Sequence, residues 1–143
     1  MELFKVTSSL SFLSFDCEFF DDECALALAE VLRINTSLTT LNLISTSIGN
    51  GGASALAEAF KVNTSLTRVR LGSYELEEEG ALVLAQAVSG NTSIIEFDLS
   101  RNSLEPTIEA ELLRISKGRV ICYSGFGSFQ PDQIDDHWRS PFL

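Results

Sequence analysis

The chain has 143 residues, 45% of them hydrophobic, and a formal net charge of −10. A chain of this length forms one domain, here 1–143, with a core large enough for independent stability. The negative charge excludes nucleic acid and anionic membranes as expected partners, because both bind basic surfaces. The charge favours a basic protein partner, or serves solubility alone.

The sequence predicts neither a secretion signal nor a membrane span. Glu2 precedes Lys5, and serines interrupt the apolar residues that follow, unlike a signal peptide. No stretch reaches the ~18 apolar residues of a spanning helix. We therefore expect a cytoplasmic protein, or one that is also nuclear.

An internal repeat of 28 residues organises the chain. The motif N-T-S-L or N-T-S-I begins at Asn35, Asn63 and Asn91. Each copy continues as L-x-x-L-x-L-x-x-x-x-L, and the central alternation has the period of a strand. A fixed period of this length is typical of a solenoid, in which stacked repeats build one continuous core. The predicted repeats are residues 10–37, 38–65, 66–93 and 94–118, followed by a fifth strand and tail in 119–143.

The first repeat is diverged but keeps the period. A strand is predicted near Phe12–Phe15 and a helix near Asp22–Arg33, which begins with an acidic cluster at 21–23. Negative charge is favourable at a helix start. Only nine residues precede Leu10, so we expect the first strand to have an open edge. This favours either a truncated larger protein or self-association at that end.

The second and third repeats are regular. Apolar residues in 53–60 and in 81–88 recur at i, i+3, i+4 and i+7, which predicts a helix in each repeat. Gly52 and Gly80 stand at matching positions where the chain turns into these helices. The acidic run at 75–79 precedes the third helix and serves either helix stability and solubility or a basic partner.

The repeated asparagines are also N-x-S/T sequons, which mark glycosylation sites in secreted proteins. Because the triplet follows the repeat period, we interpret it as a turn between helix and strand. Asparagine tolerates the left-handed conformation common at helix ends.

The fourth repeat keeps its strand, at Ile95–Ser100, but its helix is shorter. Pro106 suits a first helical turn, Gly118 ends the helix, and Arg119–Ser124 can supply a fifth strand. The tail from Gly125 to Leu143 is aperiodic and rich in aromatic residues. We expect it to pack over the last repeat as a partial cap; the alternative is a peptide that binds elsewhere.

The 28-residue period, with G-A-x-x-L-A-x-A and N-T-S-L, resembles the ribonuclease-inhibitor-like class of leucine-rich repeats, over roughly residues 10–115. NOD-like receptors, Ran GTPase-activating proteins and tropomodulins share this class. The resemblance implies an α/β solenoid, a right-handed βα superhelix with parallel strands on its concave side and helices on its convex side. The class often has Asn or Cys three residues after L-x-L. Here only Asn102 fits, whereas Glu18, Thr46 and Tyr74 do not.

No catalytic constellation is recognisable, so we expect a protein that is not an enzyme and uses no cofactor or metal. His137 is the only histidine, and metal or acid–base chemistry needs converging partners. The three cysteines, Cys17, Cys24 and Cys122, form no C-x-x-C motif, which argues against a disulfide framework or a zinc site.

The residues between the strand leucines should point to the concave face, where we predict partner binding. Because adjacent strands lie about 4.8 Å apart, Arg68 should lie beside Glu96, and Arg70 beside Asp98. These pairs are either simple cross-strand ion pairs or part of a recognition patch. The predicted function is non-catalytic protein–protein interaction; the alternatives are regulation of an enzyme such as a small GTPase, or actin capping as in tropomodulins. The candidate partner-binding residues are Phe12, Asp16, Thr40, Asn42, Ile44, Arg68, Arg70, Glu96 and Asp98.

Overall fold

The computed structural model describes residues 9–99, 102 and 104–121. Within these ranges strands and helices alternate along the chain, as the repeat predicts. The expected cap at 125–143 lies outside the described residues. The elements are β1 (Phe12–Asp16), α2 (Asp22–Ile34), β2 (Thr40–Thr46), α3 (Asn50–Val62), β3 (Arg68–Ser73), α4 (Glu78–Gly90), β4 (Glu96–Asp98), α5 (Pro106–Ile115) and β5 (Val120–Ile121).

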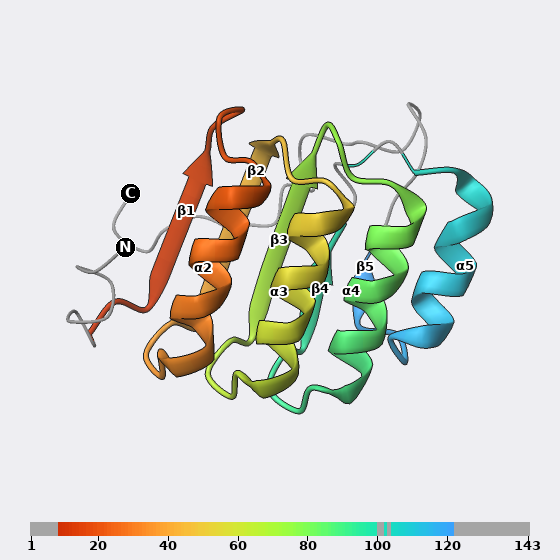
Figure 1. The fold of residues 1–143 in the computed structure, drawn as a ribbon. Coiled ribbons are helices and arrows are strands. Elements are labelled where there is room, and N and C mark those ends of the chain that lie inside the picture. The colour runs from red at the N-terminus through yellow and green to blue at the C-terminus, as the bar shows by residue number, and fades with distance from the viewer. Residues whose placement is uncertain (1–8, 100–101, 103, 122–143) are drawn as a thin grey trace, which may run out of the picture.

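The strands form one parallel sheet in the order β1-β2-β3-β4-β5, each next to its successor along the chain. Leu41 of β2 is paired with Leu13 of β1 and with Val69 of β3, and Val69 is paired with Phe97 of β4. Helices α2 to α5 stand side by side on one face of this sheet (Figure 1). The predicted α/β solenoid is therefore confirmed, with the repeats stacked in register.

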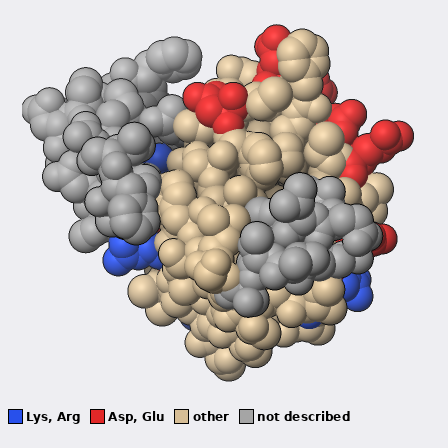
Figure 2. Space-filling view, turned by 90° about the vertical axis from the view of Figure 1, so that its left-hand side faces the viewer, with Lys and Arg blue, Asp and Glu red and all other residues tan. Residues whose placement is uncertain are grey.

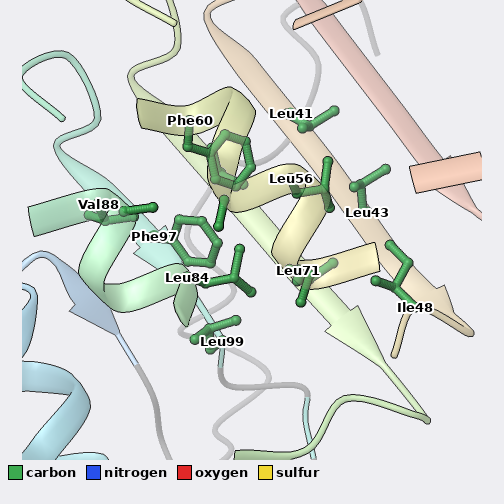
Figure 3. Close-up of a cluster of buried hydrophobic side chains, with 14 of the residues drawn as sticks. Leu41, Leu43, Ile48, Leu56, Phe60, Leu71, Leu84, Val88, Phe97 and Leu99 are labelled. Atoms are coloured by element: carbon green, nitrogen blue, oxygen red, sulfur yellow. The ribbon is translucent and has the colours of Figure 1, made fainter. Parts of the chain in front are cut away.

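One continuous apolar core fills the space between sheet and helices. The strand residues Leu41, Val69 and Phe97 are each at most 1% exposed, and they meet apolar helix residues such as Phe60 of α3 (Figure 3). The rings of Phe60 and Phe97 make an edge contact with centroids 5.7 Å apart. A single repeat could not bury these side chains alone, so the stacking supplies the fold's stability.

Two glycines allow neighbouring helices to approach closely. A Cβ on Gly52 would lie 2.5 Å from Asp22 Oδ1, and one on Gly80 would lie 2.7 Å from Asn50 Oδ1. Both oxygens also accept a backbone N–H of the next repeat: Asp22 Oδ1 that of Gly49, and Asn50 Oδ1 that of Gly80. Glycine at these two positions therefore allows the start of α3 to pack closely against α2, and the start of α4 against α3.

The asparagines of the N-T-S motif form a ladder at the turns between helix and strand. Asn63 Oδ1 accepts the backbone N–H groups of Ser65 and Leu66, at 2.9 and 2.8 Å. Its Nδ2 donates to the carbonyl oxygens of Leu32 and Asn35 in the preceding repeat, at 2.8 and 3.3 Å. Asn91 makes the equivalent bonds one repeat later. The motif thus holds each turn to its neighbour.

The expectation of a left-handed conformation at these asparagines is wrong. Their φ values lie between −85° and −72° with ψ between 135° and 142°, which is extended backbone. Asparagine is needed here for the donor and acceptor of its amide. Because Asn63 and Asn91 are buried and their Nδ2 atoms donate hydrogen bonds, they are not glycosylation acceptors in the folded protein.

Arg119 completes the ladder after the last N-T-S motif. Its guanidinium Nη1 donates to the carbonyl oxygens of Asn91 and Ile94, at 2.6 and 3.0 Å, and Nη2 donates to that of Ser89 at 2.9 Å. Of these acceptors, the Asn91 carbonyl corresponds to the Asn63 carbonyl that Asn91 bonds one repeat earlier.

Hydroxyl groups replace asparagine at the opposite edge of the sheet, where strands lead into helices. Thr46 Oγ1 donates to the carbonyl oxygen of Gly72 at 2.9 Å, and Ser73 Oγ donates to that of Ile48 at 2.6 Å. Asn102 accepts the N–H of Ser73 and donates to the carbonyl oxygen of Leu71. Tyr74, which the repeat alignment puts at this position, is exposed instead. A bulge at Ser45 (φ 55°) pairs Thr46 with Ser73 and shifts the register by one residue.

Candidate functional site

The face of the sheet opposite the helices, called the open face here, carries the candidate residues. In β2, Leu41 and Leu43 are buried in the core. Because successive strand residues point to opposite faces, the side chain of Asn42 between them lies on the open face. The same alternation applies in β1, β3 and β4, so the open face is built by every second residue of each strand.

The parallel register arranges these side chains in rows across the strands. Phe12, Thr40, Arg68 and Glu96 form one row. A second row, the middle row, consists of Ser14, Asn42, Arg70 and Asp98, and Asp16 is paired with Ile44 in a third. The structure thus brings all nine candidate residues together on one face.

Two cross-strand ion pairs form where the sequence predicted them. Arg68 Nε lies 3.5 Å from Glu96 Oε2, and Arg70 Nε lies 3.3 Å from Asp98 Oδ2. The first pair is partly exposed and contributes about 0–1 kcal/mol. The second is nearly buried, with side chains 10% and 13% exposed, so removing one partner would leave a buried charge and cost more.

Two residues of the middle row, Asn42 and Arg70, are buried. Asn42 is 6% exposed and Arg70 is 8% exposed, although the described helices all lie on the other face. Asn42 Oδ1 is buried without a hydrogen-bond partner. Sequence reasoning placed these residues on the face but did not predict their burial, because the alternation pattern assigns a face and not an exposed fraction.

The edge where strands lead into helices is acidic. All helices of the solenoid start at this edge, so acidic residues that favour helix starts collect there. The described residues of the strand-to-helix loops contain no Lys or Arg, and Figure 2 shows Asp and Glu side chains along the upper edge at the β1–α2 end. The acidic residues of this edge are Asp16, Glu18, Asp21, Asp22, Glu23, Glu75, Glu77, Glu78, Glu79 and Glu105.

Asp21 caps α2 at this acidic edge. Its carboxylate accepts the backbone N–H of Cys24 at 3.1 Å. This backbone hydrogen bond lowers the pKa of Asp21, because it stabilises the ionised carboxylate. The capping carboxylate is therefore a structural group of the helix as well as part of the acidic edge.

Two exposed aromatic side chains accompany the acidic edge. Phe19 is 81% exposed in the loop after β1, and Tyr74 is 71% exposed in the loop after β3. Tyr74 also lines a shallow pocket with Ser45, Gly72 and Ser73. Sequence reasoning missed these residues; the available signal was an aromatic residue outside the apolar positions of the repeat.

The described part of the chain offers no metal centre, since no three His, Cys, Asp or Glu side chains in it converge. Cys17 and Cys24 are free thiols. Cys122 and His137 lie outside the described residues. No helix in the described ranges has the length and apolar character of a membrane span.

Comparisons with known proteins agree with the repeat architecture. A leucine-rich-repeat family model matches residues 35–57. No curated protein matches the chain in sequence. A solved structure described as leiomodin-1 actin-binding site 2 has a similar fold, with a TM-score of 0.74 and 19% identity over 87% of this chain and 77% of that one. The repeat period and the parallel sheet agree with this short family match and support a leucine-rich-repeat fold.

Proposed function

We propose that the protein is a non-catalytic binding module that recognises a partner protein through its open face. The observation that carries this proposal is the arrangement of the open-face side chains in rows across the strands. Arg68 and Arg70 are held beside Glu96 and Asp98, so donors and acceptors stand in fixed positions before a partner arrives. Such preorganisation reduces the entropy lost on binding.

The open face alone is small for a tight complex. Five strands about 4.8 Å apart span only about 20 Å, which gives a few hundred Å2, whereas a standard interface buries about 800 Å2 on each partner. The adjoining acidic edge, with Phe19 and Tyr74 exposed on it, extends this surface. Its charge supports a partner with a basic surface, because complementary charges speed association and favour the correct orientation.

Charge reversal on the open face tests this proposal. Arg68→Glu changes a partly exposed open-face residue, and Lys61→Glu makes the same charge change at an exposed position of α3. In affinity capture from a cell extract, we expect Arg68→Glu to lose proteins that the wild type and Lys61→Glu retain. Equal recovery by all three forms would contradict recognition through the open face.

A second candidate is actin binding, and the fold similarity to leiomodin-1 actin-binding site 2 favours it. Cosedimentation of the chain with actin filaments, and capture of monomeric actin, test this candidate directly. Binding by the wild type that Arg68→Glu weakens and Lys61→Glu leaves unchanged would name the partner. The absence of binding in both assays would remove actin from consideration.

Self-association through the outer edge of β1 remains a proposal from the sequence. Among the described residues, β1 pairs with β2 alone, and an unpaired strand edge is a template for another strand. Light scattering over a range of protein concentrations should then show a dimer at high concentration. A constant monomer mass would contradict the proposal.

A further inference from the structure

We propose that the protein associates head to tail, by binding the acidic edge of one copy to the opposite edge of a second copy. That opposite edge, where helices lead into strands, is called the turn edge here and consists of residues 33–39, 61–67, 89–95 and 116–119. In Figure 1 the helices run from the acidic edge at the top to the turn edge at the bottom. The proposal does not rest on the function proposed above, because the contact leaves the open face free.

The first observation is that the two edges carry opposite charges. The turn edge contains Arg33, Lys61, Lys117 and Arg119 and no Asp or Glu, whereas the described strand-to-helix loops contain no Lys or Arg. Asp and Glu side chains lie along the top in Figure 2, and most of the visible Lys and Arg side chains lie below them. Basic residues are favourable at helix C-termini, and every described helix ends at the turn edge. Stacking of the repeats therefore concentrates opposite charges at the two edges.

The second observation is a set of exposed apolar side chains on the turn edge. Ile34 and Val62 are the last residues of α2 and α3 and are 62% and 55% exposed, and Ile95, just before β4, is 61% exposed. The fold does not require an apolar residue at the helix end, since Gly90 holds the equivalent position in α4. Covering these side chains would remove apolar surface from water, which favours association. Helix-end electrostatics explains the basic residues of this edge but not these apolar ones.

The third observation is that both edges have the same spacing, because they are the two ends of one stack of helices. The pairs Arg33–Ile34 and Lys61–Val62 are one repeat apart, which is about 10 Å between adjacent helix axes. The helix starts on the acidic edge have this same separation. When two copies are placed end to end, helix ends with basic and apolar residues face helix starts with acidic residues. The exposed rings of Phe19 and Tyr74 accompany those starts and can cover apolar residues of the turn edge.

The size of the edges suits a reversible contact. Four helices about 10 Å apart span about 40 Å, and the helix layer with the sheet beside it is roughly 15 Å deep. Each edge therefore offers about 600 Å2, slightly more than the ~500 Å2 on each partner that a biological interface needs. The net charge of −10 opposes association at long range, but physiological salt screens charges beyond about 8 Å. At contact distance the complementary edges then favour one orientation.

A contact between two different surfaces of the same chain is heterologous. It either closes into a ring or continues as an open chain of copies. An open chain leaves one free acidic edge and one free turn edge at its two ends, so a further copy can always add. Association should therefore continue past the dimer as the concentration rises. Pairing through the outer edge of β1 stops at the dimer, because each copy has one such edge.

Sedimentation velocity over a range of protein and salt concentrations tests the contact. The average mass of the wild type should rise beyond that of a dimer with protein concentration and fall with added salt. Arg33→Glu on the turn edge and Glu75→Lys on the acidic edge, both at exposed positions, should each weaken association at least about ten-fold, because like charges across an interface are costly. Gln86→Glu, in the middle of α4, is the charge control and should associate like the wild type. A constant monomer mass, or growth that stops at the dimer, would overturn the proposal.

An equimolar mixture of the Arg33→Glu and Glu75→Lys chains identifies the two surfaces. In the mixture each altered edge meets an opposite charge on the other variant, and so does each unaltered edge. Association should therefore return toward the wild-type strength, which would also show that both variants are folded. Two variants that stay dissociated when mixed would contradict the pairing of these edges. Arg68→Glu, the open-face variant, should associate like the wild type. Its dissociation would assign the contact to the open face and overturn the proposal, whereas a failed capture experiment on the open face leaves this contact intact.

Discussion

Replacing Asn63 by alanine should be far more damaging than the same change at Asn35, although both residues begin an N-T-S motif. Asn63 is 3% exposed and makes four hydrogen bonds to backbone groups: two accepted within its own turn and two donated to the preceding repeat. Asn35 accepts the equivalent N–H groups of Ser37 and Leu38. Its Nδ2 donates to the Ser37 hydroxyl, which belongs to its own turn.

The difference can be estimated from the bonds that each substitution removes. A typical intramolecular hydrogen bond contributes about 1 kcal/mol net. Counting only bonds to backbone groups, four for Asn63 and two for Asn35, Asn63→Ala should cost about 4 kcal/mol and Asn35→Ala about 2 kcal/mol. Against a typical total stability of about 5–15 kcal/mol, the first change would consume a large part of the margin and the second would be tolerated.

Urea unfolding followed by far-ultraviolet circular dichroism measures both costs on the same protein. A lower midpoint with an unchanged slope indicates lost stability, whereas a changed slope indicates that the repeats no longer unfold together. We expect the free energy of unfolding to fall by about 2 kcal/mol more for Asn63→Ala than for Asn35→Ala. Equal losses would show that the bonds between repeats contribute nothing, and would refute the ladder as the device that joins them.

Three further predictions concern packing, close approach and pH. Phe60→Ala should lower the free energy of unfolding in urea by about 3–5 kcal/mol, because Phe60 is 1% exposed and packs against Phe97. Phe19→Ala, at an 81% exposed position, should change this free energy by less than about 0.5 kcal/mol. Similar effects of the two substitutions would contradict the assigned core. Gly80→Ala should lower the melting temperature, since its Cβ would meet Asn50 Oδ1 at 2.7 Å. Gly90→Ala, with open space around its Cβ, should raise the melting temperature by reducing the conformational entropy of the unfolded chain. A rise for both substitutions would mean that the helices are not in close contact. The lowered pKa of Asp21 contributes stability that is present above the ordinary pKa of 3.8 and is lost as the pH falls through the folded-state pKa. Asp21→Asn, which keeps a capping oxygen, should flatten this part of a profile of melting temperature against pH. An unchanged profile would exclude Asp21 as a contributor.

The repeat period was sufficient to predict the sheet and the pairing across it. Because the offset of 28 residues holds through β1 to β4 up to the bulge at the end of β2, the equivalence of Leu41, Val69 and Phe97 in sequence became adjacency in the sheet. The pairs Arg68–Glu96 and Arg70–Asp98 followed from the same offset and are confirmed. The period specifies which residues lie side by side on adjacent strands, and side chains of opposite charge at such positions form ion pairs.

The period failed where the chain departs locally from it. The bulge at Ser45 pairs Thr46 with Ser73, so the hydroxyl of Ser73 holds the turn and Tyr74 is exposed. No residue pattern indicated this left-handed serine. The role of Arg119 was also missed, because an arginine that replaces an asparagine ladder uses different atoms over a longer reach.

Function was less predictable than fold for a related reason. The nine candidate residues were identified by alternation, which places side chains on a face but says nothing about burial or partners. Alternation therefore did not predict the low exposure of Asn42 and Arg70. The aromatic residues Phe19 and Tyr74 lie in loops, outside the apolar positions of the repeat. That position was a signal of exposure, but it carried no information about binding.

The parallel register of neighbouring repeats underlies both the fold and the binding face, and engineered disulfides measure it most directly. A disulfide needs Cα atoms about 4.4–6.8 Å apart, which directly paired residues of adjacent strands satisfy and residues displaced by two positions do not. Thr40→Cys with Arg68→Cys joins direct partners in β2 and β3, whereas Thr40→Cys with Arg70→Cys is displaced by two residues. Under mild oxidation, peptide mapping should find the 40–68 disulfide and not the 40–70 disulfide. Preferential formation of the 40–70 bond, or of neither bond in the folded protein, would contradict the register and the binding face built on it.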